Sequence, residues 1–195
     1  MMGVKGGGVR IWGRVAAAAL ALALAACAGP SATVYDLAAA RPAKARPVRA
    51  QIRIGPPFAT ADLDSDRILV RNGLTLALLP GGRWPQQLTT LFAARLAETF
   101  QNAGLARAID GGAATADYQL DLDIRAFELD AETSEAHVEV AAKLIAVTGG
   151  RIVDVAILAA RTPVASTDAG PVAAALDQAS AKVMTEIVQF IARRL

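Results

Sequence analysis

A stretch of alternating character, DYQLDLDIRAFEL at residues 117–129, constrains the fold of this chain most strongly. Its apolar members occupy every second position: Tyr118, Leu120, Leu122, Ile124 and Ala126. The positions between them are polar: Asp117, Gln119, Asp121, Asp123 and Arg125. A period of two with one polar face is typical of a half-buried strand in an antiparallel sheet, with one face on a core and the other toward solvent.

Two hairpins are predicted on either side of this strand. Asn72-Gly73 separates two apolar runs within residues 67–79, and an Asn-Gly pair between such runs is a strong hairpin signal because both residues tolerate positive φ. Residues 137–147 and 151–161 flank Thr148-Gly149-Gly150, which predicts the second hairpin. Shorter strands are predicted at 35–37, at 51–58 and at 105–109, with Pro56 and Pro57 ending the second of them.

Two amphipathic helices follow from spacings of three and four. The first is predicted over residues 85–103, with Pro85 in its first turn and Gly104 at its end. The second covers residues 168–194, capped by Thr167 or Asp168 and with Pro171 in its first turn. The expected apolar stripes are Leu88, Leu91, Phe92, Leu96 and Phe100 in the first helix and Leu176, Ala179, Val183, Ile187, Phe190 and Ile191 in the second.

The order of elements is therefore roughly βββα-ββββα, with strands in runs rather than in strict βαβ alternation. This order predicts the α+β class: a mainly antiparallel β-sheet with two amphipathic helices packed on one face. Residues 38–49 are rich in proline and arginine and are interpreted as a connecting loop. The length suits a single domain, which we place at residues 35–195.

The N-terminal segment has the features of an export signal. Residues 1–14 are basic and rich in glycine, and residues 15–26 form an uncharged run of twelve, shorter than the roughly 20 residues of a membrane-spanning helix. Residues 1–26 carry three bases and no acid, so residues 27–195 have a net charge near −1. The basic balance of the whole chain thus gives no reason to expect a nucleic-acid partner.

The only cysteine, Cys27, follows this segment directly and cannot form an internal disulfide. Leu24-Ala25-Ala26-Cys27 resembles a bacterial lipobox. The resemblance implies a signal peptide at 1–26, diacylglyceryl transfer to the Cys27 thiol, cleavage between Ala26 and Cys27, and a lipidated tether at 27–34. Two or three acyl chains hold a protein on a bilayer far more firmly than one. An ordinary export signal with an incidental cysteine is the alternative.

The residues after the cysteine bear on location. Ala28 and Gly29 stand where an aspartate tends to retain a lipoprotein at the inner membrane of enteric bacteria. The sequence therefore resembles one with an outer-membrane address, lipid-anchored and facing the periplasm.

No convincing catalytic set is visible. Residues 62–66 (DLDSD) imitate the start of a calcium loop, but Arg67 and Gly73 stand where an EF-hand needs Gly and Glu, so a solvated turn is expected. His137 is the only histidine, no G-x-S-x-G elbow accompanies it, and we expect it to face solvent. The carboxylates of Asp117, Asp121 and Asp123 could hold a metal or act as acid and base, yet such residues on a polar strand face are usually just exposed. We expect a non-enzyme without cofactor or metal.

The ordered features of the body resemble one family. They are Tyr35-Asp36-Leu37, the RILVR strand at 67–71, Arg83-Trp84 before a helix, the ADYQLDLDIRAFE strand at 116–128, Pro163-Val164 after a hairpin, and an Ala-rich C-terminal helix. This order is similar to that of the auxiliary lipoproteins of ABC-type transport systems, of the paraquat-inducible protein C type, over nearly all of residues 27–195. The chain departs from the family where members often carry aromatic residues and it has Leu78, Leu79 and Pro80.

The resemblance implies a non-enzymatic component of a machine that moves phospholipids or other hydrophobic molecules across the envelope and maintains the outer membrane. Its partners would be an MCE-domain periplasmic protein and, through it, an ABC permease and ATPase, with a homo-oligomer left open. Arg83 and Trp84 are candidates for partner docking, although a core tryptophan beside a surface arginine is the alternative. Two other functions stay open: a different outer-membrane assembly lipoprotein, of the lipopolysaccharide-export type, and a lipid-anchored hydrolase using the Asp117, Asp121 and Asp123 face.

Overall fold

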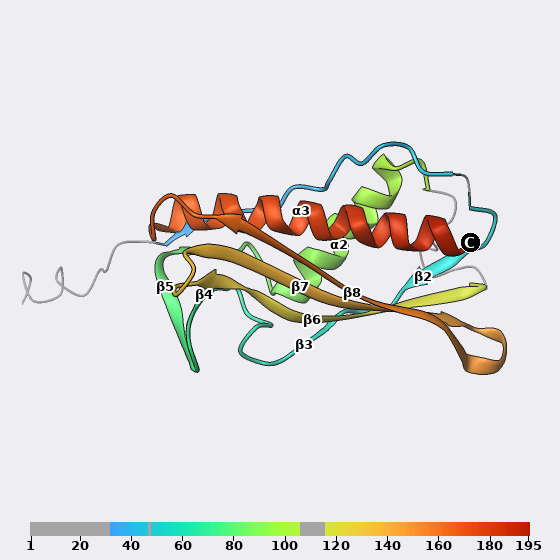
Figure 1. Cartoon of the computed structure of the whole chain (residues 1–195), viewed down its shortest axis with the longest axis horizontal. Helices are drawn as coiled ribbons and strands as arrows, with labels where there is room; N and C mark the ends of the chain where they lie inside the picture. Colours follow the sequence, from blue (N-terminus) through green and yellow to red (C-terminus); the bar gives the residue numbers. More distant parts are fainter. Residues whose placement is uncertain (1–31, 47, 106–115) are drawn as a thin grey trace, which may run out of the picture. The chain divides into compact units, whose positions relative to one another are not determined.

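The fold is described from a computed structural model of the chain, which covers residues 32–46, 48–105 and 116–195. Residues 33–195 form one compact unit (Figure 1). Within the described residues, no helix combines the length and the apolar character needed to cross a membrane. The signal and lipobox residues, Ala26 and Cys27 included, and most of the strand predicted at 105–109 lie outside the described residues.

The described strands form one mixed sheet in the order β1-β5-β4-β6-β7-β8, with β2 and β3 also paired to β6. Their bounds are β1 Thr33–Val34, β2 Ile52–Ile54, β3 Phe58–Ala59, β4 Arg67–Asn72, β5 Thr75–Arg83, β6 Tyr118–Asp130, β7 Glu135–Ala146 and β8 Arg151–Pro163. The long ladders β4–β5, β6–β7 and β7–β8 are antiparallel. The short strands β2 and β3, together with β4, pair in parallel along one edge of β6.

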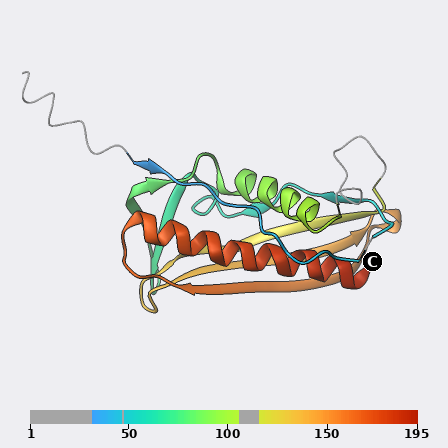
Figure 2. The same ribbon diagram turned by 90° about the horizontal axis from the view of Figure 1, so that it is seen from above.

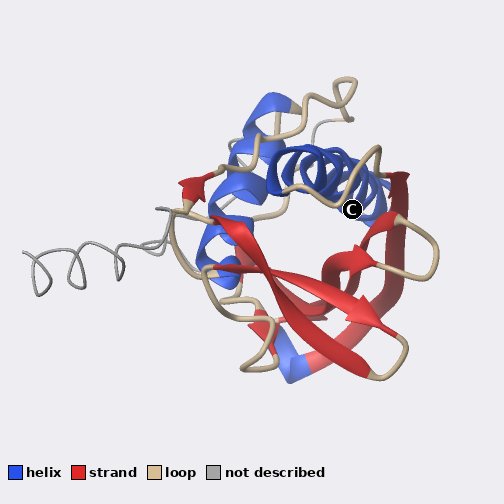
Figure 3. Ribbon diagram, turned by 90° about the vertical axis from the view of Figure 1, so that its left-hand side faces the viewer, coloured by secondary structure: helices blue, strands red, loops and turns tan. Residues whose placement is uncertain are grey.

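Both helices, α2 (Leu88–Asn102) and α3 (Ala169–Arg194), lie over the same face of this sheet (Figures 1 and 3). Seen from above, they run side by side, roughly along the direction of the long strands (Figure 2). Helix α3 contacts β5, β6, β7 and β8 as well as α2. The predicted α+β class, with two helices on one face of a mainly antiparallel sheet, is therefore confirmed, and the parallel pairs are an addition to it.

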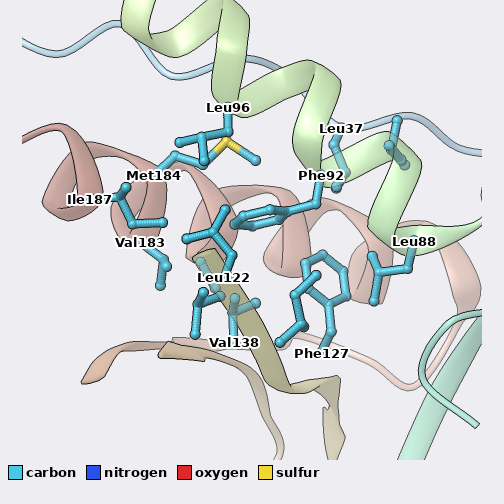
Figure 4. Packing of buried hydrophobic residues seen from close by; sticks show 14 of the residues in the cluster. Leu37, Leu88, Phe92, Leu96, Leu122, Phe127, Val138, Val183, Met184 and Ile187 are labelled. Atoms are coloured by element: carbon cyan, nitrogen blue, oxygen red, sulfur yellow. The ribbon is translucent and has the colours of Figure 1, made fainter. Parts of the chain in front are cut away.

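The core lies between the helices and the sheet. Every residue of the two predicted apolar stripes is at most 4 % exposed. Phe92 and Leu96 from α2 meet Val183 and Met184 from α3, with Leu122, Phe127 and Val138 of the sheet beneath them (Figure 4). This is the close interdigitation expected where two amphipathic helices share one sheet face.

The loop predicted at 38–49 contains no helix or strand among its described residues, and its start is fixed on the helices (Figure 2). The Asp36 carboxylate accepts a hydrogen bond from Arg95 of α2 at 2.7 Å. The Ala38 N–H donates to Asp177 of α3 at 2.7 Å, and the Ala40 N–H donates to the Thr99 hydroxyl at 3.0 Å. The short strand, however, is Thr33–Val34 and not 35–37, since only Thr33 and Val34 pair with β5.

Both predicted hairpins form, with one difference at the first turn. Gly73 takes φ +56°, but Asn72 ends β4 and pairs with Thr75, so the turn residues are Gly73 and Leu74. The second hairpin turns through the short 3-10 segment Thr148–Gly150, where both glycines have positive φ.

The helix N-termini differ from the expected caps. Helix α2 begins at Leu88, so Pro85 precedes it rather than opening it. Its N-terminus is capped from a distance by Asp64, whose Oδ1 accepts from the N–H and the hydroxyl of Thr89 at 3.2 and 2.8 Å. Asp168 occupies the N-cap position of α3 but makes no side-chain cap hydrogen bond.

Ala126 is placed on the wrong face by simple alternation. The β6–β7 register shifts between Ile124 and Ala126, which marks a bulge at Arg125. After the bulge Ala126 pairs with Glu139, whereas Phe127 pairs with the fully buried Val138. Paired residues share a face, so Ala126 lies on the face away from the helices, and the apolar positions that meet the core are Phe127 and Leu129.

Candidate docking surface on the open face of the sheet

The face of the sheet opposite α2 and α3 carries no α-helix among the described residues (Figure 3). We call it the open face. The strand registers place one row of side chains across it: Phe58 of β3, Asp123 of β6, Ala141 of β7 and Ile157 of β8. A neighbouring row joins Asp121, Lys143 and Val155.

These rows line a hollow of about 440 Å³. Its apolar side is made by Pro56, Phe58 and Val155, and its polar side by residues that include Asp121 and Lys143. Phe58 is 64 % exposed, Val155 52 % and Ile157, next to the hollow, 60 %. Large apolar side chains grouped on a surface and bordered by charges are typical of a site where another molecule binds.

The open face is bounded by an edge strand. Among the described residues β8 pairs with β7 alone, so its outer backbone groups have no partner strand over thirteen residues. Such an edge can accept an added strand from another chain. An ion pair between Asp154 of β8 and Arg194 of α3 covers one point of this edge.

A charged cluster crosses the open face from β4 to β8, at the end of β6 with which β4 pairs. Glu128 is 1 % exposed although it is a carboxylate, and Arg71 of β4 pairs with both of its oxygens. The Glu128 carboxylate raises the pKa of the Arg71 guanidinium above its usual range. Sequence reasoning missed this pair, because Glu128 reaches the open face only through the bulge at Arg125.

Two further groups of the cluster titrate away from their ordinary ranges. Arg161 of β8 bonds to Asp130 at 3.0 Å and lowers the pKa of that carboxyl. His137 of β7 is half-buried rather than fully solvent-facing, and burial, followed by the charge of Arg161, lowers its pKa.

The carboxylates proposed for acid–base or metal chemistry are engaged individually. Asp117 accepts from the Gln51 N–H at 2.8 Å, at the point where β2 begins. Asp121 accepts from Gln119 at 2.6 Å, and Asp123 pairs with Arg125 at 3.3 Å. In the described ranges no three His, Cys, Asp or Glu side chains are grouped so that they could hold a metal ion. Residues 62–66 form a turn, as expected, in which Asp64 caps α2 and Asp66 faces Arg83.

The predicted docking pair separates into a core residue and a surface residue. Trp84 is 1 % exposed and packs edge-to-face on Phe127 with ring centroids 5.7 Å apart. The indole therefore belongs to the core, as its alternative interpretation required. The Arg83 side chain is 42 % exposed and lies 3.4 Å from Asp66, so within this pair Arg83 alone offers surface to a partner.

Comparison with known proteins now identifies the family. The family model for the "ABC-type transport auxiliary lipoprotein component" matches residues 35–188, which is most of the chain. The chain belongs to this family. Because its members are lipoproteins, membership also implies a membrane-anchored protein. No curated protein matches the sequence.

Solved structures share the fold of this chain. The chain is 33 % identical to protein XCC0632 from Xanthomonas campestris, of family DUF330, with 84 % of this chain and 96 % of that one covered and a TM-score of 0.78. Hypothetical protein CT253 from Chlamydia trachomatis shares the fold at 12 % identity and a TM-score of 0.53, over 75 % of this chain and 98 % of that one. For a transport auxiliary component, the open face and its edge strand are the surfaces of interest.

Proposed function

We propose that this chain is the non-enzymatic, lipid-anchored periplasmic component of an ABC-type transport system that contains an MCE-domain protein. In this proposal it joins that protein to the outer membrane, and the system moves phospholipids or similar hydrophobic molecules across the envelope. Membership of the auxiliary lipoprotein family over residues 35–188 is the observation that supports the proposal most directly.

The anchor in this proposal is Cys27. A thiolate is a strong nucleophile toward a lipid donor, and several acyl chains give firm attachment. Residues 28–34 span at most about 25 Å when extended, at roughly 3.3–3.6 Å each, so the folded unit would stay near the bilayer.

The partner in this proposal binds the open face at the hollow lined by Phe58 and Val155. That surface combines exposed apolar side chains with charges and ends in the unpaired edge of β8. Arg83 remains a candidate for an additional partner contact.

Two experiments test the proposal. Globomycin is expected to make the precursor accumulate, and Cys27→Ala should leave the membrane fraction; a variant that stays membrane-bound without accumulation of precursor would contradict the anchor. Affinity purification of the full-length acylated protein from detergent-solubilised envelopes is expected to recover an MCE-domain protein.

A matched pair of variants sharpens the second experiment. Ile157→Asp places a charge on the open face, and Gln101→Asp places one on an exposed position of α2. We expect the first to lose the MCE-domain protein and the second to retain it. Recovery of lipopolysaccharide-export components would favour the alternative function. Recovery of no MCE-domain protein, with an intact barrier in a deletion strain, would count against the proposal.

A further inference from the structure

The β4–β5 hairpin exposes three leucines at its tip. Leu74, in the turn itself, is fully exposed, Leu76 is 40 % exposed and Leu78 53 % exposed. Turns of this kind usually carry glycine or small polar residues, and the fully exposed Leu74 contributes no buried area to the fold. Leu76 and Leu78 lie two residues apart on one side of β5, and we call the three residues the hairpin leucines.

The hairpin stands at the end of the folded unit where the chain enters it. In Figure 1 it projects away from the helices beside β1, while the C-terminus, Leu195, lies at the other end. Strand β1 pairs in parallel with β5 through Thr33 and Gly82. Thr33 therefore lies at the base of the hairpin, beside the end of β5 farthest from the tip.

The lengths allow the tip and the anchor to reach one bilayer. Gly82 is eight positions after Leu74, so the tip is at most about 27 Å from the β1 pairing at ~3.4 Å per residue. Amphipathic segments enter a membrane interface by about 5–10 Å, which would place Thr33 roughly 17–22 Å or less above it. Thr33 is six positions after Cys27, and six extended residue steps span about 20–22 Å.

We propose that the hairpin leucines insert into the interfacial region of the bilayer that holds the Cys27 lipid. This rests on the lipid anchor of the proposed function and adds a second, protein-borne contact to it. The acyl chains supply the attachment, and the hairpin leucines add buried apolar area at a second point of the folded unit.

The charges around the tip define the depth of this contact. A Cβ placed on Gly73 would lie 3.4 Å from the Glu132 carboxylate, so an acidic group lies beside the turn. Arg71, on the same hairpin, is paired with Glu128. A carboxylate is costly in hydrocarbon, so the contact stops among the headgroups and the first methylenes. Leu76 and Leu78 pair with Arg71 and Leu69 and so lie on the same side of the sheet as the open face. They do not line the hollow at Phe58 and Val155, which remains available to the partner.

The test uses the full-length acylated protein on vesicles of phosphatidylethanolamine and phosphatidylglycerol. Cys27 is the only cysteine, and acylation occupies its sulfur, so Leu74→Cys introduces a single reactive thiol for an environment-sensitive fluorophore. Thr148→Cys, in the exposed β7–β8 turn, is the matched control. The probe at position 74 is expected to shift to shorter wavelength on vesicles and to be quenched by lipids with a nitroxide near the headgroup. The probe at position 148 should do neither.

Each other outcome contradicts the proposal in a recognisable way. If the protein floats with the vesicles but the probe at position 74 stays in water, the hairpin contact is wrong while the lipid anchor stands. A shift that grows with protein concentration and ignores the nitroxide lipids would mean that a second copy or another protein covers the hairpin. Failure of the acylated protein to float would contradict the anchor, and the hairpin contact with it.

Discussion

The two faces of one sheet differ sharply in what they require of the sequence. On β7 the side chains toward the helices are Val138, Val140, Ala142 and Leu144, and all four are fully buried. Their neighbours on the open face are Glu135, His137, Glu139, Ala141 and Lys143, and none of these is buried. One side of β7 thus contributes to the core, where packing fixes the volume and shape of each side chain. The other side is a surface whose side chains can vary and can bind a partner.

The largest difference in stability between the two faces is expected for two phenylalanines. Phe92 is fully buried under the helices, and Phe92→Ala should lower the free energy of unfolding by about 3–5 kcal/mol through lost burial and a cavity. Phe58 is 64 % exposed on the open face, and Phe58→Ala should change it by less than about 0.5 kcal/mol. Denaturant unfolding measures both. Similar costs at the two positions would mean that something covers the open face.

Substitution of Gly82 tests how closely the start of α3 packs against β5. A Cβ at Gly82 would lie 2.7 Å from the Ala169 Cβ and 3.1 Å from the Tyr35 ring. Gly82→Ala should therefore cost about 1–3 kcal/mol of unfolding free energy by overpacking. Gly170, in the first turn of α3, has only an ordinary contact at 3.5 Å, so Gly170→Ala should instead stabilise by up to about 1 kcal/mol. Thermal unfolding should show a lower melting temperature for Gly82→Ala and a higher one for Gly170→Ala. Changes of the same sign would contradict the close packing of α3 against β5.

The Glu128–Arg71 pair is the exception on the open face, a buried carboxylate among exposed neighbours. Glu128→Gln should cost about 1–3 kcal/mol, because it weakens a charge-assisted pair and leaves polar atoms less well satisfied. Asp123→Asn, in the half-exposed pair with Arg125, should cost no more than about 1 kcal/mol. A double-mutant cycle with Arg71→Met measures the coupling, and a coupling near zero would show that burial of Glu128 has another cause.

The smallest effect expected is a pH dependence from His137. Its pKa is lowered in the folded state, so the unfolded chain binds the proton first as the pH falls through 6.5. Folding stability should therefore decrease as the pH falls from 7 toward 5, and His137→Gln should reduce that decrease. Asp130, whose pKa is also lowered, loses its contribution only below its ordinary value of 3.8 and does not interfere. Identical pH profiles for the two proteins would exclude this role.

The face of the sheet that packs against the helices was easier to predict from the sequence than the open face. The helix stripes and the alternation of residues 117–124 follow local periods of 3.6 and 2, and the structure confirms them. The parallel pairing of β2, β3 and β4 with β6 joins segments far apart in sequence, and no local pattern encodes it. The bulge at Arg125 shifts the faces after Ile124, which hid Glu128 and misplaced Ala126.

Three further features also depend on contacts between residues that are far apart in the sequence. Asp64 caps α2 from 25 positions away, a contact that cap signals next to the helix do not reveal. The sequence position of Trp84 allowed a docking role as well as the core role, and its packing on Phe127 decides between them. The exposed row from Phe58 to Ile157 requires three strand registers at once, so the sequence could suggest a docking surface but not its place.

Photo-crosslinking from the open face tests the central claim most directly. A photoreactive amino acid at position 157 of the acylated protein, with position 101 on α2 as control, would be irradiated in intact envelopes. We expect a cross-link from position 157 to an MCE-domain protein and none from position 101. Cross-links from 101 but not from 157, in envelopes where the MCE-domain protein still co-purifies, would contradict it.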